Sequence, residues 1–405
     1  MDLSVIKKRV KFIVLIGKAL HRYGASADRV EKALFLLAKK MNIKADFFCL
    51  PTSIVASFRL PDGEEFTRMN RLEPGKVNLE KLCLVDETVD RVIDEKISLD
   101  EGIMAVDEVL AKDHLYSDRY VNIGLMLISM GISTLLGGRL IEVLVAGFLG
   151  FGIGVFTTSV KTERIDTIIE MILSLLAAVT ALFIAHFITP LSTQNVILSS
   201  LIYFVPGLML TTAIFEISSQ NLTAGTARLV GAIIVLLKIS FGVYIANGFA
   251  QYFNFADHID FPLKAPSFLK MVFALFMSST GMVFVFQVRR IDIPWVFLAT
   301  FTSFICTRVL FYNADDVSRA FLSGAVIGSG ANLFSRLSTR PAMVFILPAI
   351  LLLVPGSIGY RGIEFLFTSN TIEGVNALFA TASIGIALVA GTYFGNLIIK
   401  PKRTL

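Results

Sequence analysis

Val205-Pro206-Gly207 stands inside the apolar run of residues 196–215, and the same tripeptide, Val354-Pro355-Gly356, stands inside the apolar run of residues 343–358. Proline removes a backbone hydrogen-bond donor, and glycine loosens the helical turn beside it. At membrane depth such breaks are tolerated only where protein buries them or where they line a water-filled cavity. Each tripeptide therefore predicts a helix that is interrupted inside a membrane.

The composition places most of the chain in a lipid bilayer. The 405 residues are 55% hydrophobic and 17% charged, with a mean hydropathy of +0.72. Residues 1–119 hold 20 Lys/Arg and 20 Asp/Glu, whereas residues 120–405 hold 17 and 12. So apolar a chain is not typical of a soluble enzyme. We expect a small cytoplasmic α+β domain at 1–119, followed by an α-helical polytopic membrane region.

The charge and the reactive side chains exclude several classes of function. The net charge of +5 arises in the membrane region, where short basic loops explain it better than nucleic-acid binding does. Three cysteines and four histidines show no metal-binding or redox spacing, so no metal site and no cofactor are expected. A phosphate-binding GxxxxGK[ST] motif is missing from the sequence, which disfavours an ATP-driven pump.

Residues 1–119 alternate between helical and β-like patterns. Amphipathic helices are predicted over 5–23 and from Ser26, a suitable N-cap, to about residue 42. Strands at 45–50, 53–60 and 64–70 surround a Pro61-Asp62-Gly63 turn, and two more helices follow at 78–95 and 99–114. Hydrolase-type side chains occur here without a nucleophile motif, namely His21, Ser26, Asp46, Cys49 and Ser53.

Ten segments of near-spanning length follow residue 119. They are predicted at 120–136, 139–158, 165–187, 196–216, 226–250, 268–288, 293–311, 317–335, 341–366 and 374–398. The two tripeptides are 149 residues apart, and this offset carries the first five segments onto the second five in order. Because five is odd, the second set must enter the membrane from the opposite side.

The predicted architecture is thus about ten transmembrane helices in two inverted five-helix repeats, 120–250 and 268–405, joined by an extracytoplasmic linker at 251–267. Loop lysines and arginines gather on the side of the N-terminus, and the basic residues 7–11 precede an apolar run that charges interrupt too early for a signal peptide. We expect a multi-pass protein of the inner (cell) membrane with both termini cytoplasmic.

Four ionisable side chains in or beside the spans need a partner or a wet cavity, namely Glu170, Glu216, Lys238 and Arg308. Glu170 and Lys238 fit a structural ion pair and a transport role equally well, whereas Glu216 and Arg308 could reach an interface. Backbone amides freed at Pro206-Gly207 and Pro355-Gly356 could bind the carboxylate of a zwitterionic substrate. Glu170 or Glu216 could then bind its ammonium group or carry a proton.

Several phrases of the sequence carry a family resemblance: Arg22 to Ser26 with Arg29-Val30-Glu31, Pro51 to Ile54, Val77-Asn78-Leu79, Ser98 to Glu101, Leu135 to Gly138 and the two Val-Pro-Gly tripeptides. In this order they resemble the threonine/serine exporter family (ThrE) in its fused two-module form. The resemblance implies export of L-threonine and L-serine driven by the proton motive force. Two-component relatives associated with succinate export make a dicarboxylate the nearest rival substrate.

Two other classes of function remain open. The membrane region could anchor a catalytic domain at 1–119, although ten spans with interrupted helices exceed what an anchor needs. A passive channel is the other alternative. The partners expected of an exporter are a small amino acid, protons and the lipid bilayer, and the sequence leaves a homo-oligomer open. We expect no catalytic residues.

Overall fold

The computed structural model describes residues 3–60, 63–73, 75–160, 167–255, 264–368 and 370–401. Besides residues 1–2 and 74 of the predicted domain and residues 369 and 402–405 of the predicted second repeat, three predicted elements fall partly outside these residues. They are the Pro61-Asp62 part of the predicted turn, residues 165–166 at the start of the predicted third span, and residues 256–263 of the predicted linker.

Residues 3–111, called the N-terminal unit below, combine four helices with a three-stranded antiparallel sheet of order β1-β2-β3. The elements are α1 (Leu3–Arg22), α2 (Ala27–Lys40), β1 (Lys44–Leu50), β2 (Ser53–Arg59), β3 (Glu65–Arg71), α3 (Leu79–Ile93) and α4 (Leu99–Ala111). Asn78 caps α3, and Ser98 forms a capping box with Glu101 at the start of α4. The predicted order of helices and strands is observed, with bounds that shift by a few residues.

The rest of the described chain is helical. Its first half holds α5 (Asp118–Leu135), α6 (Leu140–Ser159), α8 (Ile169–Phe187), α9 (Thr193–Ser200), α10 (Gly207–Ser218) and α11 (Leu222–Tyr252). Its second half holds α12 (Phe268–Val285), η1 (Arg290–Asp292), α13 (Ile293–Ile305), η2 (Cys306–Leu310), α14 (Asp316–Ser338), α15 (Met343–Leu353), α16 (Gly356–Phe367) and α17 (Thr371–Ile398).

The helix bounds of the two halves repeat at the offset found in the sequence. Helices α10 and α16 begin at residues 207 and 356, and helices α11 and α17 begin at 222 and 371. Both pairs are therefore separated by the same interval as the two tripeptides. Each half has the same order of helices and the same interruption before its last two helices.

The protein is a polytopic membrane protein by the length and apolar character of its helices. Within the described residues, seven helical stretches are long and apolar enough to cross a membrane, and α10 is a shorter apolar helix. The stretch Met343–Phe367 counts once, although it contains the second break. Helices α5 and α14 are not among the seven. The predicted count of about ten spans, and their inverted arrangement in a bilayer, stay predictions.

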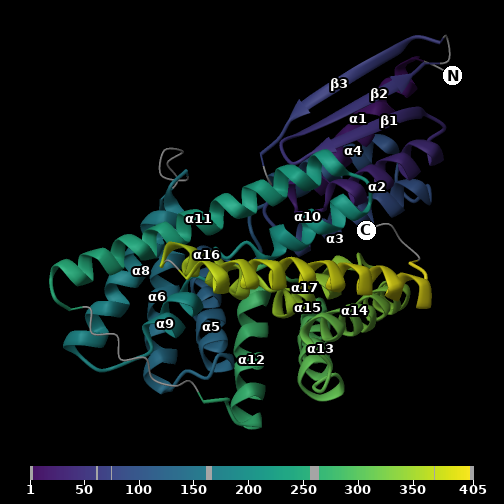
Figure 1. Cartoon of the computed structure of the whole chain (residues 1–405). Helices are drawn as coiled ribbons and strands as arrows, with labels where there is room; N and C mark the ends of the chain where they lie inside the picture. Colours follow the sequence, from purple (N-terminus) through teal and green to yellow (C-terminus); the bar gives the residue numbers. More distant parts are fainter. Residues whose placement is uncertain are drawn as a thin grey trace.

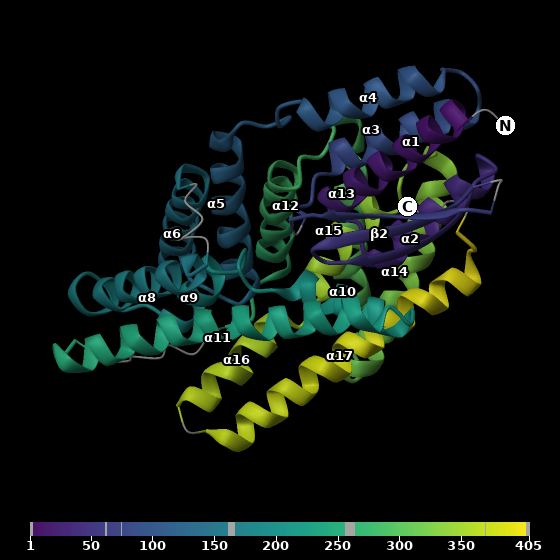
Figure 2. The same cartoon turned by 90° about the horizontal axis from the view of Figure 1, so that it is seen from above.

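The long helices run in two directions (Figures 1 and 2). Helices α11 and α17 run in roughly the same direction, while α5, α6 and α12 run transverse to them. Helices α5 and α12 are antiparallel, because Gly124 lies against Gly281 while Gly131 lies against Ala274. Small residues at this contact allow the two backbones to approach closely.

The N-terminal unit sits against the ends of several membrane helices (Figure 1). The backbone amides of Leu79 and Glu80 donate to the carbonyls of Phe286 and Gln287, at 2.9 and 3.0 Å. The Gln287 side chain in turn accepts from Tyr116 N at 2.8 Å. The unit is therefore fixed at the end where α12 finishes and α13 begins.

Candidate functional site

The two Val-Pro-Gly tripeptides lie against each other in the structure. A Cβ added to Gly207 would stand 2.6 Å from Val354 Cγ1, and one added to Gly356 would stand 2.7 Å from Val205 Cγ1. The offset that relates the two halves maps Val205 onto Val354 and Gly207 onto Gly356. The two glycine–valine contacts are therefore equivalent, and the crossing has approximate two-fold symmetry. We call residues 205–207 and 354–356 the Val-Pro-Gly crossing.

Each half of the crossing is the start of a helix. Pro206 is the N-cap of α10 with φ −79° and ψ 45°, and Pro355 is the N-cap of α16 with φ −78° and ψ 34°. The first N–H groups of a helix have no intrahelical acceptor, and the helix dipole gives this end a partial positive charge. Two positive helix ends thus meet at buried Gly207 and Gly356. This arrangement favours an anionic group.

In the first half, the helix that leads to the crossing carries buried polar side chains. Helix α9 buries Asn195, Ser199 and Ser200, and Ser133 Oγ donates to Asn195 Oδ1 at 2.6 Å. The corresponding positions of the second half are Val344, Pro348 and Ala349, which offer no side-chain hydrogen bond. The two breaks are alike in backbone, but the segments that precede them differ in chemistry.

The predicted pair of Glu170 and Lys238 is brought together. Lys238 Nζ lies 3.5 Å from Glu170 Oε2 and donates to Thr167 O at 2.7 Å. The Glu170 side chain is 17% exposed, at the first turn of α8. Within the described residues, no hydrogen bond or ion pair joins this pair to the crossing. The pair is therefore a separate, partly exposed feature.

Glu216 is fully buried in α10 and binds the N-terminal unit. Its Oε1 accepts from Ala27 N, the first amide of α2, at 2.8 Å, and Arg228 Nε lies 2.9 Å from its carboxylate. Ser26 occupies the predicted N-cap position of α2, but its hydroxyl donates to Asp28 Oδ1 at 2.6 Å instead. A glutamate of the membrane region thus caps α2, because a carboxylate stabilises the positive end of a helix.

Arg308 lies apart from the other predicted residues. It is exposed in the π-helix η2, which ends the helical stretch of α13. Among the described residues it has no ion-pair partner within 4.0 Å. Of the eight predicted site residues, the structure gathers Pro206, Gly207, Pro355 and Gly356, pairs Glu170 with Lys238, and places Glu216 and Arg308 elsewhere.

Two buried carboxylates of the membrane region are not among the residues predicted from the sequence. Glu142 at the start of α6 is 0% exposed, and Asp292 just before α13 is 1% exposed. Each is paired with an arginine three residues earlier, Arg139 and Arg289 respectively. An acid three residues after an arginine, found near the start of the second helix of each half, is a signal that the sequence contains.

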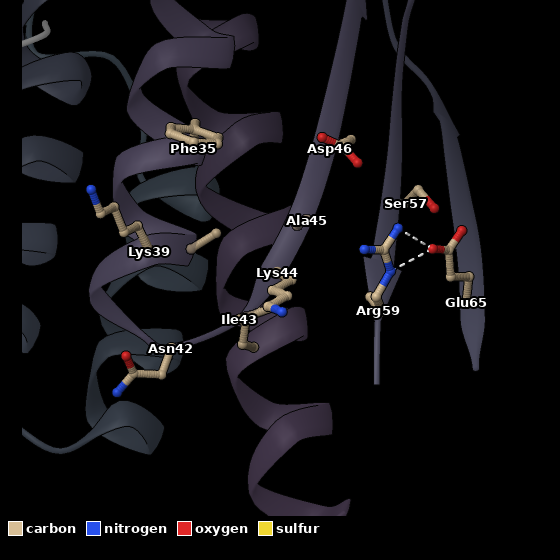
Figure 3. A pocket seen from close by; sticks show the side chains of 11 residues that line it. Phe35, Lys39, Asn42, Ile43, Lys44, Ala45, Asp46, Ser57, Arg59 and Glu65 are labelled. Atoms are coloured by element: carbon tan, nitrogen blue, oxygen red, sulfur yellow. Dashed lines mark hydrogen bonds and ion pairs between the residues drawn. The ribbon is translucent and has the colours of Figure 1, made fainter. Parts of the chain in front are cut away.

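The hydrolase-type side chains of the N-terminal unit have other partners. His21 Nε2 lies 3.2 Å from Leu50 O, and burial raises the pKa of the Cys49 thiol well above its usual value. Nearby, a surface hollow of about 470 Å³ opens between α2 and strands β1 and β2 (Figure 3). Its lining includes Lys39, Lys44 and Asp46, and Arg59 is paired with Glu65 there. The hollow is part of the N-terminal unit, not of the crossing.

The fold and the crossing define a class: a helical membrane protein whose broken helices meet in its interior. Residues 11–250 match the family described as "Putative threonine/serine exporter", and residues 271–398 match the family described as "Threonine/Serine exporter, ThrE". The chain belongs to the threonine/serine exporter family, in the form that fuses both modules. The family description points to a membrane exporter.

Fungal relatives match almost the whole chain. Pheromone-regulated membrane protein 10 of Saccharomyces cerevisiae is 26% identical over 403 residues, which cover 95% of this chain and 51% of the relative. The protein of the same name from Zygosaccharomyces rouxii is 25% identical over 440 residues, covering 99% and 44%. The chain therefore spans about half the length of these relatives. No solved structure matches it.

Proposed function

We propose that the protein is a secondary transporter that exports L-threonine and L-serine and uses the proton motive force. Membership of the exporter family supports the direction and the substrate class. In this proposal the membrane region forms ten spans as two inverted five-helix repeats, residues 1–119 form a cytoplasmic domain, and both termini face the cytoplasm of an inner-membrane protein.

The observation that carries the proposal is the meeting of two helix N-termini at the Val-Pro-Gly crossing. Helices α10 and α16 begin there with Gly207 and Gly356 in contact. First-turn amides and the helix dipoles suit the carboxylate of an amino acid. Transporters commonly place their substrate where broken helices meet near the bilayer midplane. In this proposal the polar face of α9 recognises the hydroxyl group of the substrate, and Asn195 holds that face in place through its hydrogen bonds to Ser133.

Glu170 is the proton carrier in this proposal. Its ion pair with Lys238 is long, at 3.5 Å, and its side chain is partly exposed at the first turn of α8. Glu142 and Glu216, by contrast, are fully buried and each accepts hydrogen bonds from a backbone amide and an arginine. A carboxylate that must gain and release a proton needs the looser environment of Glu170.

A dicarboxylate such as succinate is the second candidate substrate. Two positive helix ends meet at one point, and this arrangement would suit two carboxylates as well as one. Cells loaded with a threonine dipeptide would release threonine through an amino-acid exporter, whereas preloaded succinate would leave through the alternative. Whichever substrate leaves in a strain with the protein and stays in a deletion strain identifies the class.

The test of energy coupling uses the same cells. Collapse of the proton gradient should end export against a concentration gradient, and Glu170→Gln should do the same in a protein that still folds. The control is Glu373→Gln, an exposed acid in the first turn of α17. Export that only equilibrates the substrate would indicate a channel. Normal uphill export by Glu170→Gln would show that Glu170 is not the proton carrier and that its ion pair with Lys238 is structural.

A further inference from the structure

Each half of the membrane region fastens the start of its broken helix to a buried carboxylate. The first latch consists of Arg139, Glu142 and residues 190–192. Glu142 Oε1 accepts from Ser192 N, the N-cap residue of α9, at 3.1 Å. Arg139 Nη2 donates to Glu142 Oε1 at 2.6 Å and to Pro190 O at 2.8 Å. The beginning of α9 is thus held through both an acceptor and a donor.

The second latch consists of Arg289, Asp292 and Arg340. Arg289 Nε donates to Asp292 Oδ2 at 2.9 Å, and Arg340 Nη1 donates to Asp292 Oδ1. Arg340 lies in the short connection between α14 and α15. This latch therefore holds the beginning of α15, as the first one holds the beginning of α9. It has one additional partner, because Arg289 Nη1 donates to Glu87 of α3 at 2.6 Å.

The latches lie at opposite ends of the α5–α12 pair. Helices α5 and α12 are antiparallel, and each latch begins within a few residues of the C-terminal end of one of them. The first latch follows α5 through the Gly137-Gly138 turn, and the second follows α12 through Gln287. From these opposite ends, α9 and α15 lead to the Val-Pro-Gly crossing.

Helix capping explains an acid at each position, since Glu142 Oε2 also accepts from Arg139 N at 2.8 Å and Asp292 is the N-cap of α13, but capping does not explain the contact to the start of the broken helix. A buried ion pair contributes little net stability compared with apolar side chains of similar volume. Most neighbouring positions differ between the halves, as Asn195 and Val344 do. Both halves nevertheless keep a buried acid, an arginine three residues before it, and a contact to the start of the broken helix.

We propose that Glu142 and Asp292 are positioning residues that control access to the crossing from its two sides. Release of Glu142 frees the start of α9 and opens one side, and release of Asp292 frees the start of α15 and opens the other. This inference rests on the proposed transport function, because only a protein with a central site needs two separate access paths.

The test measures access to two buried positions that correspond to each other in the two halves, Ser200 in α9 and Ala349 in α15. Full-length protein in lipid nanodiscs, with its three native cysteines replaced by alanine, receives Ser200→Cys or Ala349→Cys. The rate of modification by a small charged methanethiosulfonate reagent is followed by mass spectrometry. Glu142→Gln should raise the Ser200→Cys rate about tenfold, the factor that corresponds to one lost charge-assisted hydrogen bond, without changing the Ala349→Cys rate. Asp292→Asn should do the reverse.

Two milder variants guard against a general loss of structure. Arg139→Gln and Arg340→Gln keep the carboxylates and remove one partner each, and Glu373→Gln is the matched control on an exposed acid. Thermal unfolding identifies variants that no longer fold. If Glu142→Gln or Asp292→Asn does not fold, the labelling rates in Arg139→Gln or Arg340→Gln test the proposal in its place. Equal increases at both cysteines, or no increase at either, would overturn the proposal.

The labelling uses no substrate, so its outcome is separable from the proposed function. A selective labelling pattern in a protein that exports neither threonine nor serine would keep the latches and reject the proposed substrates. Normal threonine export combined with unselective labelling would reject the latches alone.

Discussion

The two halves of the membrane region share their backbone plan and differ in the side chains around it. Both contain an interrupted helix whose second part begins at a glycine of the crossing, and both anchor the first part through a buried acid. Helix α9, however, has eight residues and buries polar side chains, whereas α15 has eleven apolar residues with Pro348 inside it. We infer that the shared features form the moving framework and that the first half supplies substrate selectivity.

The N-terminal unit adds a second difference between the halves. It contacts the first half through Glu216 and the second half through Phe286, Gln287 and Arg289. In the first half, the contact reaches α10, the helix that begins at the crossing. In the second half, it reaches the second latch. The unit is therefore placed to respond to movement of both halves.

The largest effect is expected for bulky side chains at the crossing. Gly207→Leu and Gly356→Leu should both abolish export, because even a Cβ at these positions would collide with a valine of the other half. Overpacking costs about 1–3 kcal/mol, and about 1.4 kcal/mol already corresponds to tenfold in a rate or equilibrium. Threonine efflux from dipeptide-loaded cells is the measurement.

Gly248→Leu is the matched control, since a Cβ there would meet no atom within 4 Å. Loss of export in only one of the two crossing variants would show that the halves are not equivalent at this point.

The next largest effect concerns Glu216. Glu216→Gln leaves Arg228 and the first amide of α2 with a neutral acceptor in place of a carboxylate, which costs about 1 kcal/mol for each hydrogen bond that loses its charge. Hydrogen exchange should become faster at the first turn of α2 and remain unchanged at α3, which docks through backbone hydrogen bonds. Unchanged protection of Ala27 would mean that Glu216 does not hold the N-terminal unit.

A smaller effect is expected when the first half is given a residue of the second. Asn195→Val introduces the side chain found at the equivalent position 344. The preference for threonine over alanine should fall about tenfold, because a buried hydrogen-bonding group usually contributes about 1–3 kcal/mol to recognition of a hydroxyl. Val344→Ala should leave the preference unchanged. Equal preferences in the parent and in Asn195→Val would assign Asn195 to packing.

The smallest effect concerns pH and the N-terminal unit. Burial lowers the pKa of His21, with nearby Arg228 acting in the same direction. The unfolded chain then binds a proton more readily than the folded one, so this contribution to stability is present above the unfolded pKa and is lost as pH falls. Between pH 7.5 and 5.5, His21→Gln should lose less thermal stability than the parent. An equal loss of thermal stability in the parent and in His21→Gln would show that His21 does not contribute to the pH dependence.

The sequence was sufficient to predict the order of the helices and the position of the two breaks. Proline and glycine mark the breaks because their backbone properties are local, and the spacing of the two tripeptides recurs in the helix starts at Gly207 and Gly356. The contact between the two breaks could not be predicted, since it depends on how α10 and α16 pack in three dimensions. The repeated tripeptide indicates that the two breaks occupy equivalent positions in the two halves, but it does not indicate how far apart the breaks lie.

The partners of the ionisable residues were harder to predict. Glu170 and Lys238 pair across α8 and α11, as one of the two interpretations expected. The partner of Glu216 is a backbone amide 189 residues away, and no sequence pattern identifies a backbone amide as a partner. Ser26 is a residue type that commonly caps a helix, so the sequence does not indicate a distant cap for α2. Glu142 and Asp292 were missed because they stand at helix starts, where an acid is usual.

The contact between the two breaks is the central claim, and a rescue experiment tests it most directly. A Cβ on Gly207 would collide with Val354 Cγ1, so Gly207→Ala should reduce threonine export, and adding Val354→Ala, which removes that methyl group, should restore it. The coupling between the two changes should lie within about 0.5–3 kcal/mol, as for residues in direct contact. If Val354→Ala leaves the export defect of Gly207→Ala unchanged, the two breaks do not meet in the working transporter.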